Sequence, residues 1–285
     1  MRYSAELGNS YGEAWYGYYC YNGYGMDKDQ EKAIYWYKQA ALQNDVDAMC
    51  ALPKLYFDAQ DNDSTIFWGT KKECCDSADI QYYVGAAYYN KDDYKNAESW
   101  WKKAALQNDV DALWWMYLLN TAIKQDSVAA FEYLEKAVEA KYPDALNEMG
   151  CNYADGYVVE KDLEKSKELF REAASMGCKE AYNNLGNLYS YKDYIKRPNW
   201  EIAVDFFRQG AELGSVESQY AFALCLKKGR GVKKDKQSAK YWLIKAAQNG
   251  HEGAKRDLKK MGVVFSKMDV PIKQKNEGTD SEAQY

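Results

Sequence analysis

The apolar residues of this chain recur at the spacing of amphipathic helices, in two alternating patterns. One pattern places apolar residues at i, i+3, i+4, i+7 and i+8, as in Ala33-Trp36-Tyr37-Ala40-Ala41 and Ala239-Trp242-Leu243-Ala246-Ala247. The other pattern reads A-x-x-x-L-G-x-x-Y, as in Ala181-Leu185-Gly186-Tyr189. Each pattern gives its helix one apolar stripe that must be buried, so the chain is expected to be all-α.

The two patterns together form a repeating unit of two helices. The segment ALQNDVDA occurs at Ala41 to Ala48 and again at Ala105 to Ala112, 64 residues later, which indicates a period near 32. Successive units then begin 36, 32, 32, 33, 36, 37 and 36 residues apart, at Gly12, Ala48, Ile80, Ala112, Ala145, Ala181, Ser218 and Ala254. Stacked units can bury stripes that a single unit cannot. The sequence therefore predicts seven stacked units and a closing helix.

Glycines mark two positions in these units. The sixth residue of the first helix is a glycine in four units, where it allows a neighbouring helix to approach closely: Gly17, Gly85, Gly150 and Gly186. After the first helix, glycine stands where a helix ends in the left-handed backbone conformation, at Gly23, Gly156 and Gly229. These glycines are interpreted as helix ends and not as phosphate-binding loops.

One stretch of the last unit carries a family resemblance. It runs from Gly229-Arg230-Gly231-Val232-Lys233-Lys234-Asp235 through Ala239 and Trp242 to Ala246-Ala247-x-x-Gly250-His251. The sequence resembles the Sel-one-like repeat family, a branch of the tetratricopeptide-like helical solenoids, over roughly residues 5 to 260. The resemblance implies a right-handed α-solenoid, or superhelix, of about seven helix–turn–helix repeats of 32–37 residues.

The second unit departs from this pattern. Pro53 replaces the helical glycine, and Thr70 and Lys71 are aligned with the bulky apolar pair of the second helix. The domain boundaries follow from the repeats. We expect a partial helix or cap at 1–11, seven repeats at 12–253, a capping helix at 254–263 and a partly disordered tail at 264–285.

The net charge of −5 is distributed unevenly along the chain. Residues 227–275 carry 15 basic and 4 acidic residues, a local +11, whereas the remainder carries 23 basic and 39 acidic residues, or −16. An acidic majority argues against a nucleic-acid groove, although the basic end remains available to an acidic partner. The first fifteen residues lack the pattern of a signal peptide, and no apolar stretch reaches membrane-spanning length. The expected location is cytoplasmic, or secreted or periplasmic if an upstream signal is missing.

The cysteines point to the same compartment. The seven cysteines form an odd set without regular spacing, at positions 20, 50, 74, 75, 151, 178 and 225. Such a pattern is more typical of reduced, buried thiols than of a disulfide framework. We therefore expect no disulfide. The adjacent Cys74 and Cys75 are interpreted as small buried side chains at the end of a second helix.

Few residues are candidates for chemistry. His251 is the single histidine, which excludes mechanisms that need two imidazoles, and it is interpreted as structural. Ser99 and Lys102 match the S-x-x-K pattern of serine acyltransferases, but its companion motifs are absent. The acidic loop residues Asp58, Asp61 and Asp63 lack the glycine and terminal glutamate of a calcium loop. No catalytic, cofactor or metal site is predicted.

The excess of aromatic residues is the strongest functional feature of the sequence, since 15% of the chain is aromatic and 27 residues are tyrosine. Core positions of the first helix span about 0 to 140°, so positions 2, 6, 9 and 10 face away from the core. In tetratricopeptide-like solenoids that face lines the concave groove. The candidate partner-binding residues are Tyr18, Tyr21, Phe57, Tyr82, Tyr89, Trp114, Leu118, Asn147, Asn183, Asn187, Tyr191 and Tyr220. The alternative is that these side chains pack between adjacent units.

The sequence thus favours a monomeric, non-enzymatic protein–protein interaction scaffold or adaptor that binds a protein or peptide in its concave groove, without cofactor, nucleic acid or membrane. Exposed rows of tyrosine and tryptophan are typical of protein interfaces. An immunity-type inhibitor of a toxin is the alternative, and an enzyme of unknown type is a distant third.

Overall fold

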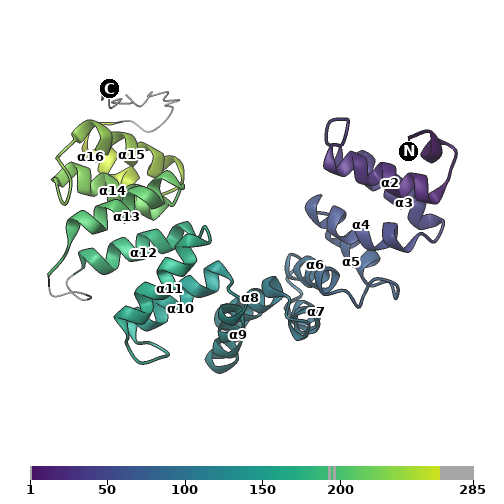
Figure 1. The fold of residues 1–285 in the computed structure, drawn as a ribbon, viewed down its shortest axis with the longest axis horizontal. Helices are drawn as coiled ribbons and strands as arrows, with labels where there is room; N and C mark the ends of the chain where they lie inside the picture. The colour runs from purple at the N-terminus through teal and green to yellow at the C-terminus, as the bar shows by residue number, and fades with distance from the viewer. Residues whose placement is uncertain (1, 192–193, 195–196, 264–285) are drawn as a thin grey trace, which may run out of the picture. The chain divides into compact units, whose positions relative to one another are not determined.

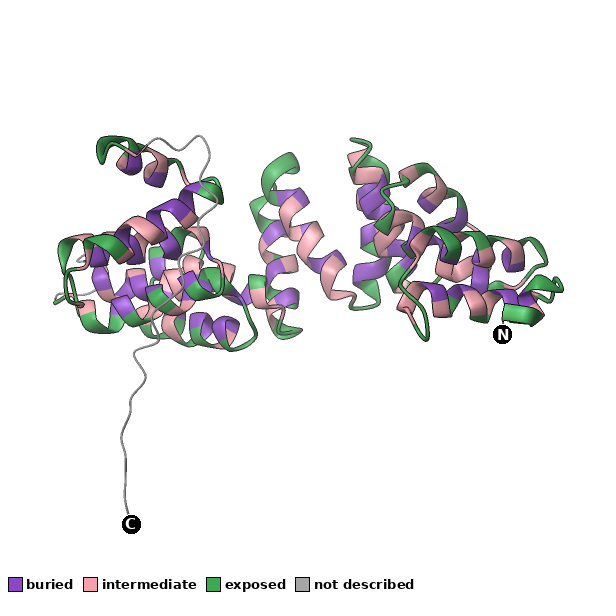
Figure 2. Cartoon of the chain, turned by 90° about the horizontal axis from the view of Figure 1, so that it is seen from above, coloured by how far each residue is buried: buried purple, intermediate pink, exposed green. Residues whose placement is uncertain are grey.

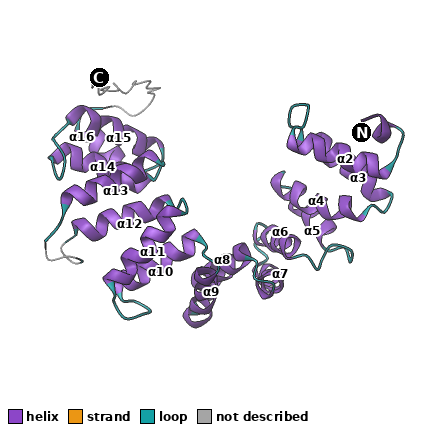
Figure 3. Ribbon diagram, in the orientation of Figure 1, coloured by secondary structure: helices purple, strands orange, loops and turns teal. Residues whose placement is uncertain are grey.

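In a computed structural model of the chain, residues 2–191, 194 and 197–263 are described. The tail expected at 264–285 lies outside this range. The described residues form helices joined by turns and loops, and they contain no strand (Figures 1 and 3). The helices are α1 (Arg2–Glu6), α2 (Ser10–Asn22), α3 (Gln30–Leu42), α4 (Val46–Asp58), α5 (Asn62–Gly69), α6 (Ala78–Tyr89), α7 (Tyr94–Leu106), α8 (Val110–Leu119), the π-helical turn η1 (Asn120–Lys124), α9 (Ser127–Glu139), α10 (Pro143–Asp155), α11 (Leu163–Ser175), α12 (Lys179–Ser190), α13 (Trp200–Glu212), α14 (Val216–Lys228), α15 (Lys236–Gln248) and α16 (Glu252–Lys260).

The helices form two compact units, Met1–Tyr153 and Ala154–Tyr285. In the first unit, α2 packs on α3, α4 on α5, α6 on α7 and α8 on α9. In the second unit, α12 packs on α13 and α14 on α15, with α16 against α15. We call the even-numbered helices from α2 to α14 the A helices and their odd-numbered successors the B helices. The fold is an all-α solenoid of helix pairs, which confirms the predicted fold class.

An acidic or amide side chain begins every B helix. The side chains of Asp29, Asp61, Asp93, Asp126, Asp162, Asn199 and Asp235 each accept a hydrogen bond from a backbone N–H in the first turn of α3, α5, α7, α9, α11, α13 and α15, respectively. These N–H groups have no partner within the helix, so the cap stabilises each helix start by about 1 kcal/mol. The caps therefore mark the repeat as clearly as the apolar stripes do.

In three repeats, a glycine of the A helix faces an aromatic ring of the B helix. A Cβ atom added at Gly17 would lie 3.0 Å from the Tyr37 ring, and one added at Gly85 would lie 2.5 Å from the Trp101 ring. The same arrangement recurs in the second unit, where a Cβ at Gly186 would lie 2.4 Å from Phe207. The absence of a side chain at these glycines lets the ring fill the space between the helices.

The second repeat reverses this arrangement. Pro53 is buried within α4, and the B-helix position that holds a ring elsewhere is Gly69. The caps Asp29, Asp61 and Asp93 are 32 residues apart, so Trp68 and Gly69 occupy the places of Trp36 and Tyr37. The alignment that put Thr70 and Lys71 there is wrong, because α5 ends at Gly69 and the next eight residues form a turn.

The turn after α5 also overturns the expectation that all cysteines are reduced. Cys74 in this turn and Cys50 in α4 form a disulfide, with Cα atoms 5.2 Å apart and a sequence separation of 24. Irregular sequence spacing concealed this pair, because only the early end of α5 returns the chain to α4. The other five cysteines are not disulfide-bonded. Burial raises the pKa of the Cys20 thiol and raises that of Cys225 to about 11.

The predicted glycine helix ends are confirmed in both units. Gly23, Gly156 and Gly229 have φ values of 76°, 70° and 71°, in the left-handed region. The buried side chains lie where helices meet, and each helix has an exposed stripe on its other side (Figure 2). Trp101 is fully buried and donates its indole N–H to the Tyr82 carbonyl at 3.2 Å.

The contact between Gly85 and Trp101 gives a first prediction. Gly85→Ala should lower the free energy of unfolding by about 1–3 kcal/mol, because the added methyl group overpacks a buried ring. Urea denaturation measures the change. Ser99→Ala, at an exposed position of α7, is the control and should stay within about 0.5 kcal/mol of the parent protein. A Gly85→Ala variant as stable as the parent would contradict the close approach.

The disulfide gives a second prediction. Alkylation of the denatured, unreduced protein should modify the five free cysteines, and alkylation after reduction should modify all seven. Intact-protein mass spectrometry counts the modified thiols, and peptide mapping should find Cys50 joined to Cys74. Seven modified cysteines without reduction would show that the pair is not oxidised.

Candidate functional site

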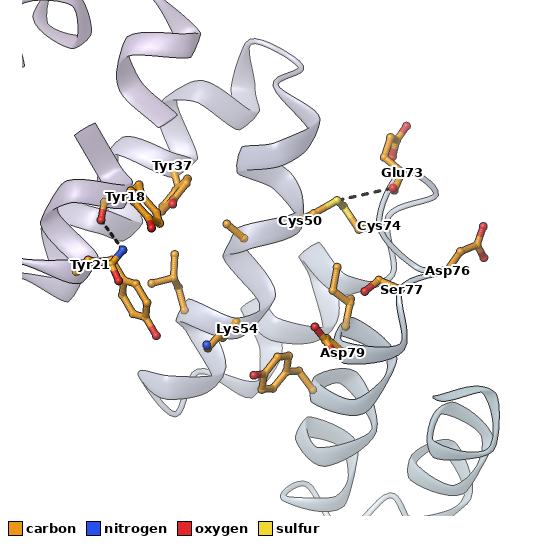
Figure 4. Close-up of a pocket in the computed structure, with 15 residues that line it drawn as sticks. Tyr18, Tyr21, Tyr37, Cys50, Lys54, Glu73, Cys74, Asp76, Ser77 and Asp79 are labelled. Carbon is orange, nitrogen blue, oxygen red and sulfur yellow. Dashed lines mark hydrogen bonds between the residues drawn. A yellow bond between two sulfur atoms is a disulfide. The ribbon is translucent and has the colours of Figure 1, made fainter. Parts of the chain in front are cut away.

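A pocket that contains predicted residues lies on the A helices of the first unit. It has a volume of about 600 Å³ and is lined from α2, α4 and α6, with contributions from α3 and the turn after α5. We call it the tyrosine pocket, and its lining residues are Tyr18, Tyr21, Asn22, Tyr37, Cys50, Ala51, Lys54, Leu55, Glu73, Cys74, Asp76, Ser77, Asp79, Ile80 and Tyr83 (Figure 4).

The tyrosines of this pocket offer both ring faces and hydroxyl groups. Burial raises the pKa of Tyr37 and of Tyr83 to about 12, so both phenols keep their protons at physiological pH. The Tyr21 hydroxyl donates to Asp58 Oδ2 at 3.1 Å, which joins α2 to α4. Lys54 Nζ lies 5.9 Å from the centre of the Tyr21 ring. The pocket therefore offers ring faces and hydroxyl groups held in place by neighbouring A helices.

A second pocket adjoins the first along α2. It has a volume of about 440 Å³, and we call it the edge pocket, lined by Tyr11, Ala14, Trp15, Tyr18, Tyr37, Asp45, Asp47 and Ala51. It shares Tyr18, Tyr37 and Ala51 with the tyrosine pocket. The two pockets are thus parts of one indented surface, with Tyr18 between them.

The other predicted residues of the first unit line neither pocket, and four of them pack against neighbouring rings. Phe57 lies 5.4 Å from the Tyr83 ring centre, and Tyr82 lies 5.3 Å from it. Tyr89 contacts Trp101 and Trp115 at 5.6 and 5.2 Å. Trp114 contacts Tyr117 and Tyr142 at 5.1 and 5.7 Å. These four side chains, like Leu118 and Asn147, are half-buried.

In the second unit, the predicted residues lie in two separate places. Asn187 and Tyr191 line a pocket of about 140 Å³ that also includes Lys228 and Arg230. Tyr220 instead stacks on His251, with ring centres 4.1 Å apart. Asn183 is half-buried on α12. The structure therefore brings Tyr18 and Tyr21 together in one pocket and Asn187 and Tyr191 in another.

The sequence analysis missed a further position of the A helix. Trp15, Ala51 and Tyr83 occupy the same place in three successive repeats, and each lines one or both pockets of the first unit. This place, three residues after the start of the repeat, lies at about 300° around the helix axis. The outward-facing positions 2, 6, 9 and 10 span about 180 to 280°, so it falls just outside them. A wider arc would have included all three.

His251 has the structural role that was expected. Its Nδ1 accepts a hydrogen bond from the Ala254 N–H at 3.0 Å and caps α16. A nitrogen that accepts carries no proton, so in the neutral ring Nε2 is the donor, and it lies 3.1 Å from a Glu217 oxygen. Both ring nitrogens are thus occupied within the fold.

The remaining candidates for chemistry are also engaged in the fold. Lys102 pairs with Glu98 at 2.5 Å, and this hydrogen bond raises the pKa of Lys102, the opposite of what a general base beside Ser99 needs. Asp61 caps α5, and Asp63 pairs with Lys91. Within the described ranges, no cluster of three metal-ligating side chains occurs, and no helix is both long and apolar enough to cross a membrane.

Comparison with known proteins gives the repeats a family. The family model of the Sel1 repeat matches residues 10–45, 79–109, 112–142, 143–178, 179–215 and 216–251. Residues 46–78 are not matched, and they contain α4 and α5. In this repeat, Pro53 and Gly69 stand where other repeats have the helical glycine and the aromatic ring. A crystal structure of a Sel1 repeat protein from Oxalobacter formigenes has a TM-score of 0.71 and 25% identity, over 91% of this chain and 78% of that chain.

Two similar proteins are regulators by name. An exopolysaccharide production negative regulator of Rhizobium meliloti is 31% identical over 144 residues, 46% of this chain and 53% of that protein. A chitin synthase regulatory factor of Schizosaccharomyces pombe is 26% identical over 220 residues, 61% of this chain and 24% of that protein. The chain thus spans about half or less of these relatives. The six matched repeats cover most of the sequence, and the chain therefore belongs to the Sel1 repeat family.

Proposed function

We propose that this chain is a non-enzymatic scaffold that binds a protein or peptide on the A-helix face of its first three repeats. Sel1 repeat proteins generally act as protein-interaction scaffolds, and the two relatives above are named as regulators. The observation that carries the proposal is the indented surface of the tyrosine and edge pockets. The volume of each of the two pockets lies in the range of pockets that take small ligands.

The ring content of this surface supports binding of a protein. Tyrosine and tryptophan supply large contact areas at a small entropy cost, and they are enriched among the residues that dominate interface energies. Tyr18 is 40% exposed although three aromatic neighbours surround it. Its position between the two pockets makes it the central anchor of the proposed interface.

The test of this function begins with capture of the partner from the native organism and its identification by mass spectrometry. Tyr18→Ala and Tyr21→Ala should each weaken binding of the purified partner by about 2 kcal/mol, or roughly thirtyfold in Kd, as central anchors do. Tyr35→Ala is the matched control, since Tyr35 is an exposed tyrosine on the B helix α3. An unchanged Kd in both groove variants would show that the partner binds elsewhere.

A stability measurement separates groove residues from packing residues. Tyr18→Ala should change the free energy of unfolding by less than about 1 kcal/mol, because Tyr18 is an exposed side chain. Tyr89→Ala should cost about 2 kcal/mol or more, because its ring packs against Trp101 and Trp115. Urea denaturation of both variants provides the comparison. Equal losses would mean that Tyr18 also belongs to the core.

A further inference from the structure

The rings at the N-terminal edge form a continuous exposed series. Tyr11 contacts Trp15 with ring centres 6.0 Å apart, Trp15 contacts Tyr18 at 5.7 Å, and Tyr18 contacts Tyr24 at 5.8 Å. The four side chains are 60%, 39%, 40% and 54% exposed, in the order Tyr11, Trp15, Tyr18 and Tyr24. An exposed aromatic series of this length exceeds the scattered apolar residues that ordinary surfaces carry.

Carboxylates surround these rings. The linings of the two pockets contain five acidic residues, namely Asp45, Asp47, Glu73, Asp76 and Asp79, and one basic residue, Lys54. Within the described part of the chain, none of the five carboxylates pairs with a lysine or arginine. Figure 4 shows Asp79 beside the tyrosine pocket and Glu73 and Asp76 at its outer rim. The surface is therefore aromatic and strongly acidic.

This combination of groups selects a cation. The face of an aromatic ring is negative, and it attracts ammonium and guanidinium groups, most strongly those of arginine. An unpaired carboxylate nearby adds a charge-assisted hydrogen bond to the same group. Lys54 beside Tyr21 shows that a cation has access to a ring of this pocket. The same charges repel phosphate groups and acidic peptides.

The inference rests on the proposed function and specifies its partner. The geometry points to a basic segment of a partner protein as the occupant of this surface. One arginine or lysine side chain binds in the edge pocket against Trp15 and Tyr18, beside Asp45 and Asp47. A second cation binds on the acidic side of the tyrosine pocket, whose lining includes Asp76 and Asp79.

The test uses a random peptide library displayed on phage and selected on the full chain. Selected peptides are synthesised, and their Kd is measured by fluorescence anisotropy. We expect the selected sequences to be enriched in arginine and lysine, and their binding to weaken as the salt concentration rises. Tyr18→Ala should weaken binding about tenfold or more.

Charge variants locate the binding site. The double variant Asp45→Asn/Asp47→Asn keeps a capping side chain at the start of α4 and should weaken binding about three- to tenfold, and Asp76→Asn/Asp79→Asn should act similarly. Asp27→Asn/Glu31→Gln removes the same charge outside both pockets and should change Kd less than about twofold. Lys54→Gln should strengthen binding of a basic peptide, since it removes the repelling charge.

Each other outcome overturns the inference in a recognisable way. Selection of uncharged or acidic peptides that still require Tyr18 would refute the basic partner and leave the scaffold function standing. Basic peptides that bind all charge variants equally would place the site elsewhere. Selection of no peptide that depends on Tyr18 or Tyr21, or self-association of the chain through these residues instead, would remove both this inference and the proposed peptide-binding function.

Discussion

In three repeats, the close approach of the A helix to its B helix depends on the contact between a glycine and an aromatic ring. Gly17, Gly85 and Gly186 face Tyr37, Trp101 and Phe207, and a Cβ at any of the three would lie within 3.0 Å of the ring. A glycine weakens an isolated helix by about 1 kcal/mol relative to alanine. Burial of a large ring in the space that the glycine leaves offsets this cost, because it removes more apolar area from water than a methyl group could.

This contact also builds the candidate site. The Tyr37 ring that lies against Gly17 continues past the glycine and lines both the tyrosine pocket and the edge pocket. One side chain therefore fixes the spacing of α2 and α3 and forms part of the floor of the indented surface. The Tyr18 ring is exposed on α2, whereas the Tyr21 ring packs against the edge of the core and also lines the tyrosine pocket.

Periodicity explains why much of the fold could be predicted from the sequence. The apolar stripes recur in successive repeats, the helical glycines in four of them and the glycine helix ends in three, and such recurrence indicates the packing of stacked helix pairs. The helical angles of Tyr18 and Tyr21 predicted that they face away from the core, and the family resemblance predicted a groove on that face; both residues line the tyrosine pocket. Tyr89 shows the limit of that argument, since an outward angle on its own helix does not reveal Trp115, which the next A helix brings against it.

Departures from periodicity explain what could not be predicted. The disulfide depends on where α5 ends, and an eight-residue helix with Gly69 at its last position gives no apolar pattern from which that end can be read. The charges of the pocket rim have the same origin. Glu73, Asp76 and Ser77 belong to the turn after α5, in the interval that the Sel1 repeat model leaves unmatched.

The second repeat thus combines the weakest family resemblance with much of the candidate site. In a regular repeat, α5 would continue for another turn and its C-terminal residues would pack as a small apolar pair, as Ala104 and Ala105 do in α7. In this repeat, Pro53 and Gly69 replace the usual glycine and ring, α5 ends at Gly69, and the chain crosses to α6 through a polar turn held by Cys74. That turn supplies the far wall of the tyrosine pocket and most of its acidic residues. The irregular second repeat therefore contributes an acidic wall to the tyrosine pocket, because its turn after α5 replaces the helical residues that regular repeats pack at this place.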